Sequence, residues 1–291
     1  MKIVDIRPTL ASWPKRIYEW HELPEEFHPA LARWRDAGME PGNVTYIPPV
    51  HLGSSDPQFA TAWFGDYAMI QTLQNDVVDI FAFKRGDIPA LVYEHQTLKC
   101  KIIVPRVAGS ELEFDYAQVK EDQLRPVISL LLGQPGERPY PIDHPDHSMD
   151  SLPNRTLMYH PSILCRRFDD NINDWVWFRS SLMVLPFIAR RRPRPEYLFA
   201  NMDRGFVVID RNFYRRRVFY FTWEDIISIK MVPHQWRRGP GVVVTGKSGI
   251  VAEVPLIQDN IRVVAEYLEK VKALGIPNVE IECDIEGLMG R

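Results

Sequence analysis

The sequence predicts an α+β protein that is mainly β, with antiparallel strands and a closing C-terminal helix in each half and a helical extension at the N-terminus. From Tyr67 onward, apolar and polar residues alternate with a period of two in runs separated by short turns. This pattern is typical of strands with one buried face. Each set of runs is followed by a segment with apolar residues at helical spacing, and one hydrophobic pattern occurs in both halves.

Residues 1–60 are expected to be an N-terminal extension with one helix. The segment "LPEEFHPALARWRDAG" places apolar side chains on one helical face and ends at Gly38, a common C-terminal stop. Residues 39–58 are dense in Pro, Gly and Ser and are predicted to be a loop. The apolar face of the helix consists of Phe27, Ala30, Leu31 and Trp34.

Residues 61–133 are expected to form a first domain, and residues 134–170, which are rich in proline, a linker. The predicted strands of the first domain are "YAMIQTL", "VVDIFAF", "ALVYEHQTLKCKIIV" and "SELEFDYAQV". The segment "KEDQLRPVISLLLG" then predicts a helix. Pro126 fits such a helix only near its N-terminal turn, where the missing N–H costs nothing.

Residues 171–291 are expected to form a second domain with the same order of elements. The predicted strands are "EYLFANM", "GFVVID", "RRVFYFTW", "DIISIKMV", "GVVVTG" and "IVAEVPL". The segment "QDNIRVVAEYLEKVKALG" predicts an amphipathic helix with Asp259 as its N-cap and Gly275 as its stop. Its buried stripe consists of Ile261, Val264, Ala265, Leu268 and Val271.

The two halves share a hydrophobic pattern. "ALVYEHQTLKCKIIVP" (residues 90–105) matches "VFYFTWEDIISIKMVP" (residues 218–233), so that Leu91 aligns with Phe219 and Pro105 with Pro233. The helices that follow match at a longer offset, which fits an insertion at "HQWRRGPG". Two explanations stay open: an internal duplication, or the patterning that any two antiparallel sheets followed by a helix would share.

Composition predicts an intracellular globular protein. The chain of 291 residues is 45% hydrophobic and 25% charged, which is enough apolar material for packed cores. It shows neither a secretory signal pattern nor an apolar run long enough to span a membrane. Its three cysteines are far apart and are expected to be reduced thiols. We therefore expect a cytoplasmic protein, with peripheral association with the inner membrane left open.

Enzymatic chemistry is not expected from the motifs. The segment "DHPDHSMD" gathers Asp143, His144, Asp146, His147 and Asp150, which are all metal-ligand types. Their spacing and proline-rich surroundings favour a solvated linker, so we expect no metal and no cofactor. A metal-dependent hydrolase that uses this His/Asp linker remains the least favoured alternative. Nucleophile and phosphate-binding motifs are absent from the sequence.

Charge is divided unevenly along the chain. Residues 1–132 carry 13 Lys and Arg against 18 Asp and Glu, whereas residues 171–250 carry 14 against 6. Arginine binds carboxylate and phosphate groups through two parallel N–H donors, so its clusters indicate an acidic partner. In the predicted basic rim, Arg215, Arg216 and Arg217 form an exposed turn between two strands. The rim consists of Arg211, Arg215, Arg216, Arg217, Arg237 and Arg238. The alternative is a solvated hairpin turn whose charges protect strand edges.

A second candidate surface combines aromatic and basic residues. Its members are Trp175, Trp177, Arg190, Arg191 and Arg192. Tryptophan at the head-group level with arginines beside it is typical of a membrane-surface or partner contact. Packing inside the protein is the alternative. Recognition of nucleic acid is not expected, because no nucleic-acid-binding fold is recognisable.

The segment "VVIDRNFYRRRVFYFTWEDIISIKMV" resembles bacterial pleckstrin-homology-like (PH-like) domains, over residues 197–273 and less closely over 67–133. The resemblance implies two bent antiparallel sheets, each closed by a C-terminal helix. It also implies a scaffold that binds proteins or anionic lipids. We therefore expect a non-enzymatic protein-binding or adaptor protein, of which an immunity-type, toxin-neutralising protein is one form. The alternative is a peripheral anionic-lipid-binding protein.

Overall fold

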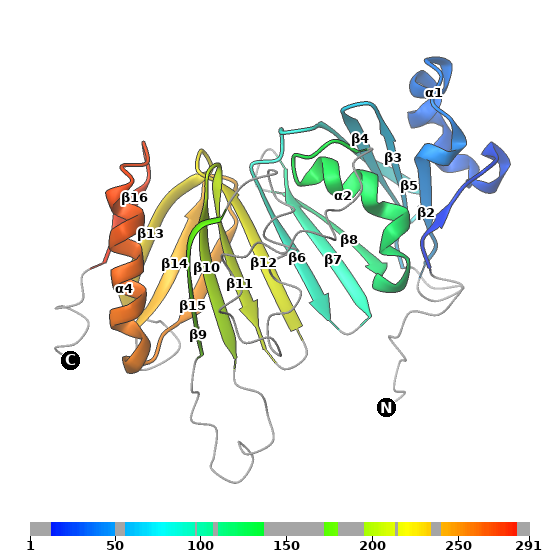
Figure 1. Ribbon diagram of the computed structural model, residues 1–291. Helices are drawn as coiled ribbons and strands as arrows, with labels where there is room; N and C mark the ends of the chain where they lie inside the picture. Colours follow the sequence, from blue (N-terminus) through cyan, green and yellow to red (C-terminus); the bar gives the residue numbers. More distant parts are fainter. Residues whose placement is uncertain are drawn as a thin grey trace, which may run out of the picture. The chain divides into compact units, whose positions relative to one another are not determined.

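The computed structural model confirms a mainly β protein with several antiparallel sheets and a small number of helices (Figure 1). Elements are labelled as in Figure 1. The structure describes residues 13–49, 56–96, 98–106, 110–136, 172–179, 195–212, 215–233 and 240–283.

The chain divides into two compact units. Unit 1 comprises Met1–Ile88, His95–Ile102 and Leu112–Pro141. Unit 2 comprises Pro89–Glu94, Ile103–Glu111 and Ile142–Arg291. Three strands therefore contribute residues to both units, and each unit is described by itself below. The domain boundaries at residues 60, 133 and 170 stay a prediction.

Unit 1 contains a five-stranded antiparallel sheet in the order β1-β2-β3-β4-β5. Strands β3, β4 and β5 are joined by tight turns, so the hydrogen-bonded order follows the chain. The strands are β1 (Lys15–Arg16), β2 (Val44–Ile47), β3 (Gln58–Phe64), β4 (Tyr67–Gln74) and β5 (Val77–Lys84).

The predicted helix of the N-terminal extension is confirmed as α1 (His28–Asp36). Phe27 and Leu31 are buried in one cluster with apolar residues of β2, β3 and β4, so the helix covers one face of the sheet. Gly38 ends the helix with a φ of 97°, a value that favours glycine. Three short 3-10 helices flank these elements: η2 (Trp20–Glu22), η3 (Glu25–Phe27) and η4 (Pro41–Asn43).

The prediction of a loop over residues 39–58 is wrong at its centre, where β2 runs from Val44 to Ile47. Its sequence "VTYI" contains β-branched and aromatic residues, which fit a pleated, half-buried surface. The strand escaped prediction because it is short and is flanked by the Pro and Gly residues that indicated a loop.

The rest of the first half contains three more strands and a helical segment. The strands are β6 (Ala90–Gln96), β7 (Lys99–Pro105) and β8 (Glu111–Ala117). The helical segment consists of η5 (Gln118–Leu124) and α2 (Arg125–Leu131). Pro126 lies in the first turn of α2, as predicted, and α2 packs on β3 and β4.

Unit 2 contains two sheets. In the first, residues 90–94 of β6 lie next to β12, which gives the order β6-β12-β11-β10-β9. In the second, the order is β15-β14-β13-β16, with β16 parallel to β13. The strands are β9 (Ile172–Arg179), β10 (Glu196–Met202), β11 (Gly205–Arg211), β12 (Arg215–Thr222), β13 (Ile226–Pro233), β14 (Pro240–Gly246), β15 (Val251–Pro255) and β16 (Glu280–Glu282).

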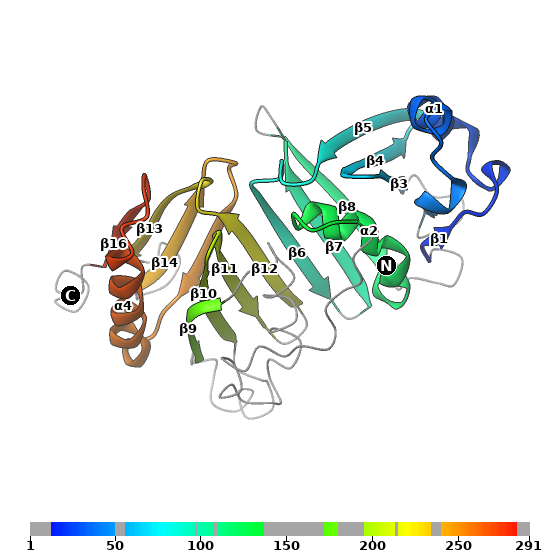
Figure 2. The same ribbon diagram turned by 45° about the horizontal axis from the view of Figure 1, so that its top comes forward.

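Helix α4 (Gln258–Ala273) lies beside β9 and β16 (Figures 1 and 2). Its predicted buried stripe is confirmed. The five residues of the stripe are buried among apolar side chains of both unit 2 sheets, and Tyr267 is buried with them. The prediction of Asp259 as N-cap is wrong. The extended chain after β15 ends at Ile257, which takes the cap position, so Asp259 falls inside the first turn.

Each half therefore shows strands followed by a helix: β2–β8 before α2, and β9–β15 before α4. The sequence prediction covers β4–β8 and β10–β15, but not β2, β3 or β9. In both halves the first four of these strands hydrogen-bond in chain order. None of the helices in the described part of the chain is long and apolar enough to cross a membrane.

Candidate functional site

The predicted basic residues of the β11–β12 hairpin lie in regular strands. Arg211 is the last residue of β11, and β12 begins at Arg215. We expected the three consecutive arginines in the turn itself. Asn212 places them in the strand instead: its side-chain oxygen accepts the N–H of Arg215 at 3.1 Å, and its own N–H donates to the Arg215 carbonyl at 2.8 Å.

Strand geometry divides these arginines between the two faces of the sheet. Arg211 is the cross-strand partner of Arg216, and Asp210 is the partner of Arg217. Directly paired residues in an antiparallel sheet point to the same face, and neighbours along a strand point to opposite faces. Arg216 and Arg211 therefore share one face, and Arg215 and Arg217 share the other.

On the first face, a row of charged residues crosses four strands. Glu196 of β10 is paired in register with Arg179 of β9 and with Arg211 of β11. Its side chain is only 5% exposed and accepts Arg179 Nε at 3.0 Å and Arg211 Nη1 at 3.2 Å. Arg216 continues the row on β12. Two cations thus neutralise one buried carboxylate, which satisfies both of its oxygens.

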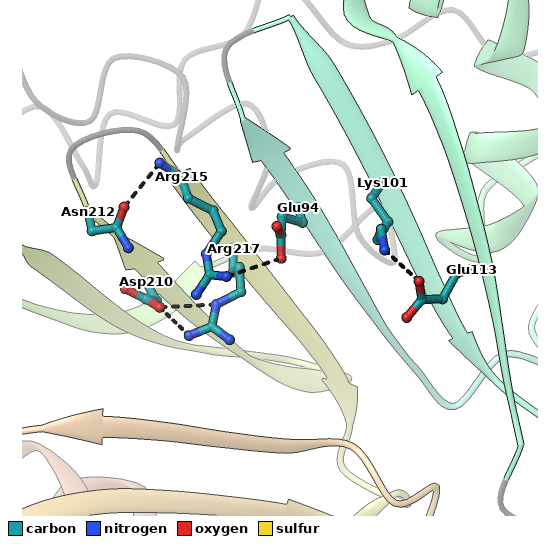
Figure 3. Close-up of polar contacts among 7 residues, drawn as sticks. All are labelled: Glu94, Lys101, Glu113, Asp210, Asn212, Arg215 and Arg217. Carbon is teal, nitrogen blue, oxygen red and sulfur yellow. Dashed lines mark hydrogen bonds and ion pairs between the residues drawn. The ribbon is translucent and has the colours of Figure 1, made fainter. Parts of the chain in front are cut away.

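On the second face, each arginine has an acidic partner (Figure 3). Arg217 donates to one oxygen of Asp210 from Nε at 3.1 Å and from Nη2 at 2.5 Å. Its guanidinium also lies 5.2 Å from the ring centre of Phe219, a cation–π distance. Arg215 Nη1 is 4.0 Å from Glu94 Oε2 of β6. This end of the sheet is therefore a network of ion pairs.

We define the arginine rim as this network at the β11–β12 end of the sheet. It contains five arginines against three carboxylates, so its local charge is far smaller than the arginines alone suggest. The side chains of Arg179, Arg211, Arg215 and Arg217 nevertheless remain 30–45% exposed. Carboxylates accept hydrogen bonds from Arg179, Arg211 and Arg217, and part of each of these side chains stays accessible. The members of the rim are Arg179, Arg211, Arg215, Arg216, Arg217, Glu94, Glu196 and Asp210.

The other predicted site residues lie elsewhere. Trp175 and Trp177 are partly buried in β9 on the same face as Arg179, whose guanidinium lies 5.0 Å from the Trp177 ring centre. The remaining predicted residues fall outside the described residues: Arg190, Arg191, Arg192, Arg237 and Arg238.

Sequence reasoning missed the acidic members of the rim. Glu196 and Asp210 were not flagged, because an isolated acid in a strand carries no signal of its own. Their partners become visible only once strand register is known. The one local signal was the sequence Asp210-Arg211, where opposite charges meet at the end of a predicted strand.

The described residues contain no group of three or more His, Cys, Asp or Glu side chains arranged to hold a metal ion. The linker cluster from Asp143 to Asp150 lies outside them. Cys100 and Cys283 are buried thiols that form no disulfide within the described residues. Burial, with a smaller effect of the Glu269 charge, raises the pKa of Cys283 to about 11. At neutral pH this thiol is therefore almost entirely protonated and a poor nucleophile.

Comparison with known proteins identifies no relative. No family model matches the chain, and no curated protein matches it. The PH-like resemblance therefore stays a prediction, and function must be argued from the geometry of the chain itself.

Proposed function

We propose that the chain is a non-enzymatic protein-binding protein that engages an acidic surface of its partner through the arginine rim. The observation that carries this proposal is that Arg179, Arg211 and Arg217 donate to carboxylates and Arg215 lies 4.0 Å from one, while all four side chains are still 30–45% exposed. Arginine is enriched where proteins bind each other, because its planar group donates in several directions. A guanidinium that is already fixed loses little conformational entropy when a partner binds.

The scaffold of this proposal is a pair of PH-like domains. Unit 2 supports it with four strands in chain order, three further antiparallel strands and then α4, whose buried stripe packs on both sheets. In the described residues of the first half, seven strands from β2 to β8 likewise precede α2, with the two-residue β1 before them. Under this proposal, α4 closes the bent sheet of the second PH-like domain. The arginine rim lies at one end of strands β9 to β12. Such a scaffold presents a binding surface without catalytic groups.

A protein partner fits the rim better than a lipid surface does. A basic residue near an anionic membrane contributes about 1 kcal/mol, so membrane attachment needs an excess of cations. Here three carboxylates offset most of the charge of five arginines. A mixed network of fixed donors and acceptors instead suits a partner of complementary charge pattern, where register and specificity matter.

Affinity capture from the native host tests this proposal. Arg215→Gln/Arg216→Gln removes two rim cations and keeps the Arg217–Asp210 pair, so the fold is expected to survive. Capture of the partner should fall strongly and should weaken with salt, because charge-assisted contacts are screened. The matched control Arg262→Gln/Lys272→Gln removes two exposed cations from α4 and should capture as the parent chain does.

Two results would overturn the proposal. One is capture that is insensitive both to the rim variant and to salt, which would make the rim a structural network only. The other is binding of the parent chain to phosphatidylserine vesicles with loss in the rim variant and no captured protein, which would favour the lipid alternative.

A further inference from the structure

Among the described residues, β5 forms an open edge of its sheet. It runs for eight residues in register with β4, without a bulge, from Val77 opposite Gln74 to Lys84 opposite Tyr67. Val77 is 66% exposed and Ile80 is 48% exposed. A long, regular and apolar edge is a template for another strand, and proteins normally protect such edges.

The hydrogen-bonding groups of this edge can be assigned. The β4–β5 turn has two residues, Asn75 and Asp76, and Arg85 N–H donates to Asp66 O at 2.8 Å across the other end of the ladder. Bonded and non-bonded pairs alternate along an antiparallel ladder. Odd-numbered residues of β5 therefore bond to β4. The N–H and C=O groups that point outward belong to Val78, Ile80 and Ala82.

At the C-terminal end of β5, the outward backbone groups already have hydrogen-bond partners within the chain. Lys84 N–H donates to the Asp87 carboxylate at 2.9 Å, and Lys84 O accepts the Asp87 N–H at 3.0 Å. The open part thus has its midpoint at Ile80, with Val78 and Ala82 on either side. The outward N–H and C=O groups of these three residues can form hydrogen bonds with a further strand.

Other edge strands in the described residues are protected. Strand β9 is covered by α4: Asn260 donates to Arg179 O at 2.7 Å, and Lys270 lies 3.3 Å from Asp174. Strand β8 carries three acids, two of them paired with lysines of β7. Strands β1 and β16 have two and three residues, and β15 ends in proline. Only β5 combines length, regularity and apolar exposure without such a device.

We propose that β5 pairs antiparallel with β5 of a second copy of this chain, about a two-fold axis at Ile80. In this register the outward residues face one another: Ile80 meets Ile80 of the second copy, and Val78 meets Ala82. The charges at the two ends also match, because Asp76 lies opposite Lys84 of the second copy. A parallel pairing in register would place these like charges side by side, which destabilises a sheet.

This self-pairing is independent of the arginine rim. All of β5 belongs to unit 1, whereas the rim residues belong to unit 2. The dimer joins two five-stranded sheets into one, and it makes each assembly bivalent toward a partner of the rim. Bivalency raises apparent affinity without any new contact.

Analytical ultracentrifugation of the full chain tests the pairing. The parent chain should sediment as a dimer that dissociates on dilution. Ile80→Pro removes an outward N–H and leaves the hydrogen bonds between β4 and β5 complete. The variant should therefore be monomeric, and its melting temperature should be unchanged. Ile80→Val keeps the donor and should remain dimeric. A monomeric parent chain, or a dimer that Ile80→Pro leaves intact, would overturn the proposal.

Register can be tested separately. Lys84→Glu places two acids opposite each other and should weaken the dimer roughly three- to tenfold, while Asp76→Lys/Lys84→Glu should restore it. Ile80→Cys should form a symmetric disulfide under mild oxidation, because the paired Cα atoms of a hydrogen-bonded pair lie within disulfide reach. Val78→Cys, which faces Ala82, should not. Equal cross-linking from both positions would exclude this register.

Discussion

Leu268→Ala is expected to lower the free energy of unfolding by about 2–5 kcal/mol, the range for removing a fully buried leucine side chain. Leu268 is 0% exposed and lies on the buried stripe of α4, among apolar residues of both unit 2 sheets. The truncation removes apolar contacts and leaves a cavity between the helix and the sheets. Denaturant unfolding followed by circular dichroism measures the loss.

Val263→Ala is the matched control for that measurement. Val263 lies in the same helix and is 51% exposed, and alanine has the higher helix propensity, so the change should be near zero or slightly stabilising. If the two variants unfold at the same denaturant concentration, α4 does not pack on the sheets as described. The PH-like closure would then lose its support.

Arg217→Thr is expected to cost about 1.5–3 kcal/mol of stability, because hydrogen bonds to a charged group are lost and a buried acceptor is left without them. The Asp210 side chain is only 10% exposed, and Arg217 donates to it twice. The double variant Asp210→Thr/Arg217→Thr places two threonines opposite each other, a favourable cross-strand pair. The double variant should therefore lose less free energy of unfolding than the two single variants lose together.

A double-mutant cycle on denaturant unfolding measures this coupling. Additive losses would mean that the two side chains contribute independently, and the pair would not hold the rim in place. Coupling larger than the roughly 0.2–1 kcal/mol that the new threonine pair can itself contribute would support a rim in which Arg217 is fixed before a partner arrives. The same cycle explains why the rim test above neutralises Arg215 and Arg216 and spares Arg217.

The fold was predictable where a sequence pattern persists over many residues. The stripe from Ile261 to Val271 has helical spacing over three turns, and apolar or alternating runs of five or more residues mark most strands of both halves. Short or terminal features were not predictable. Strand β2 is four residues long, and the cap of α4 depends on where the preceding extended chain ends rather than on Asp259 itself.

The candidate site was only half predictable. The cluster of arginines is visible in the sequence, but its electrostatic state depends on partners that come together only in the sheet. Glu94 lies far from Arg215 along the chain, and Glu196 meets Arg211 through strand register. Sequence therefore indicated a free basic turn, whereas strand pairing produces a network in which three carboxylates offset part of the charge of five arginines. That difference supports the expected protein partner over the alternative of a lipid surface.

Site-specific photo-crosslinking tests the central claim most directly. A photoreactive residue at position 216, with Arg211 and Arg215 kept, should cross-link the captured partner in the native host extract, and added salt should reduce the product. The same residue at position 227 or 263, both exposed and outside the rim, should give no product above background. Equal cross-linking from position 263 and from position 216, or from position 263 alone, would contradict partner recognition at the arginine rim.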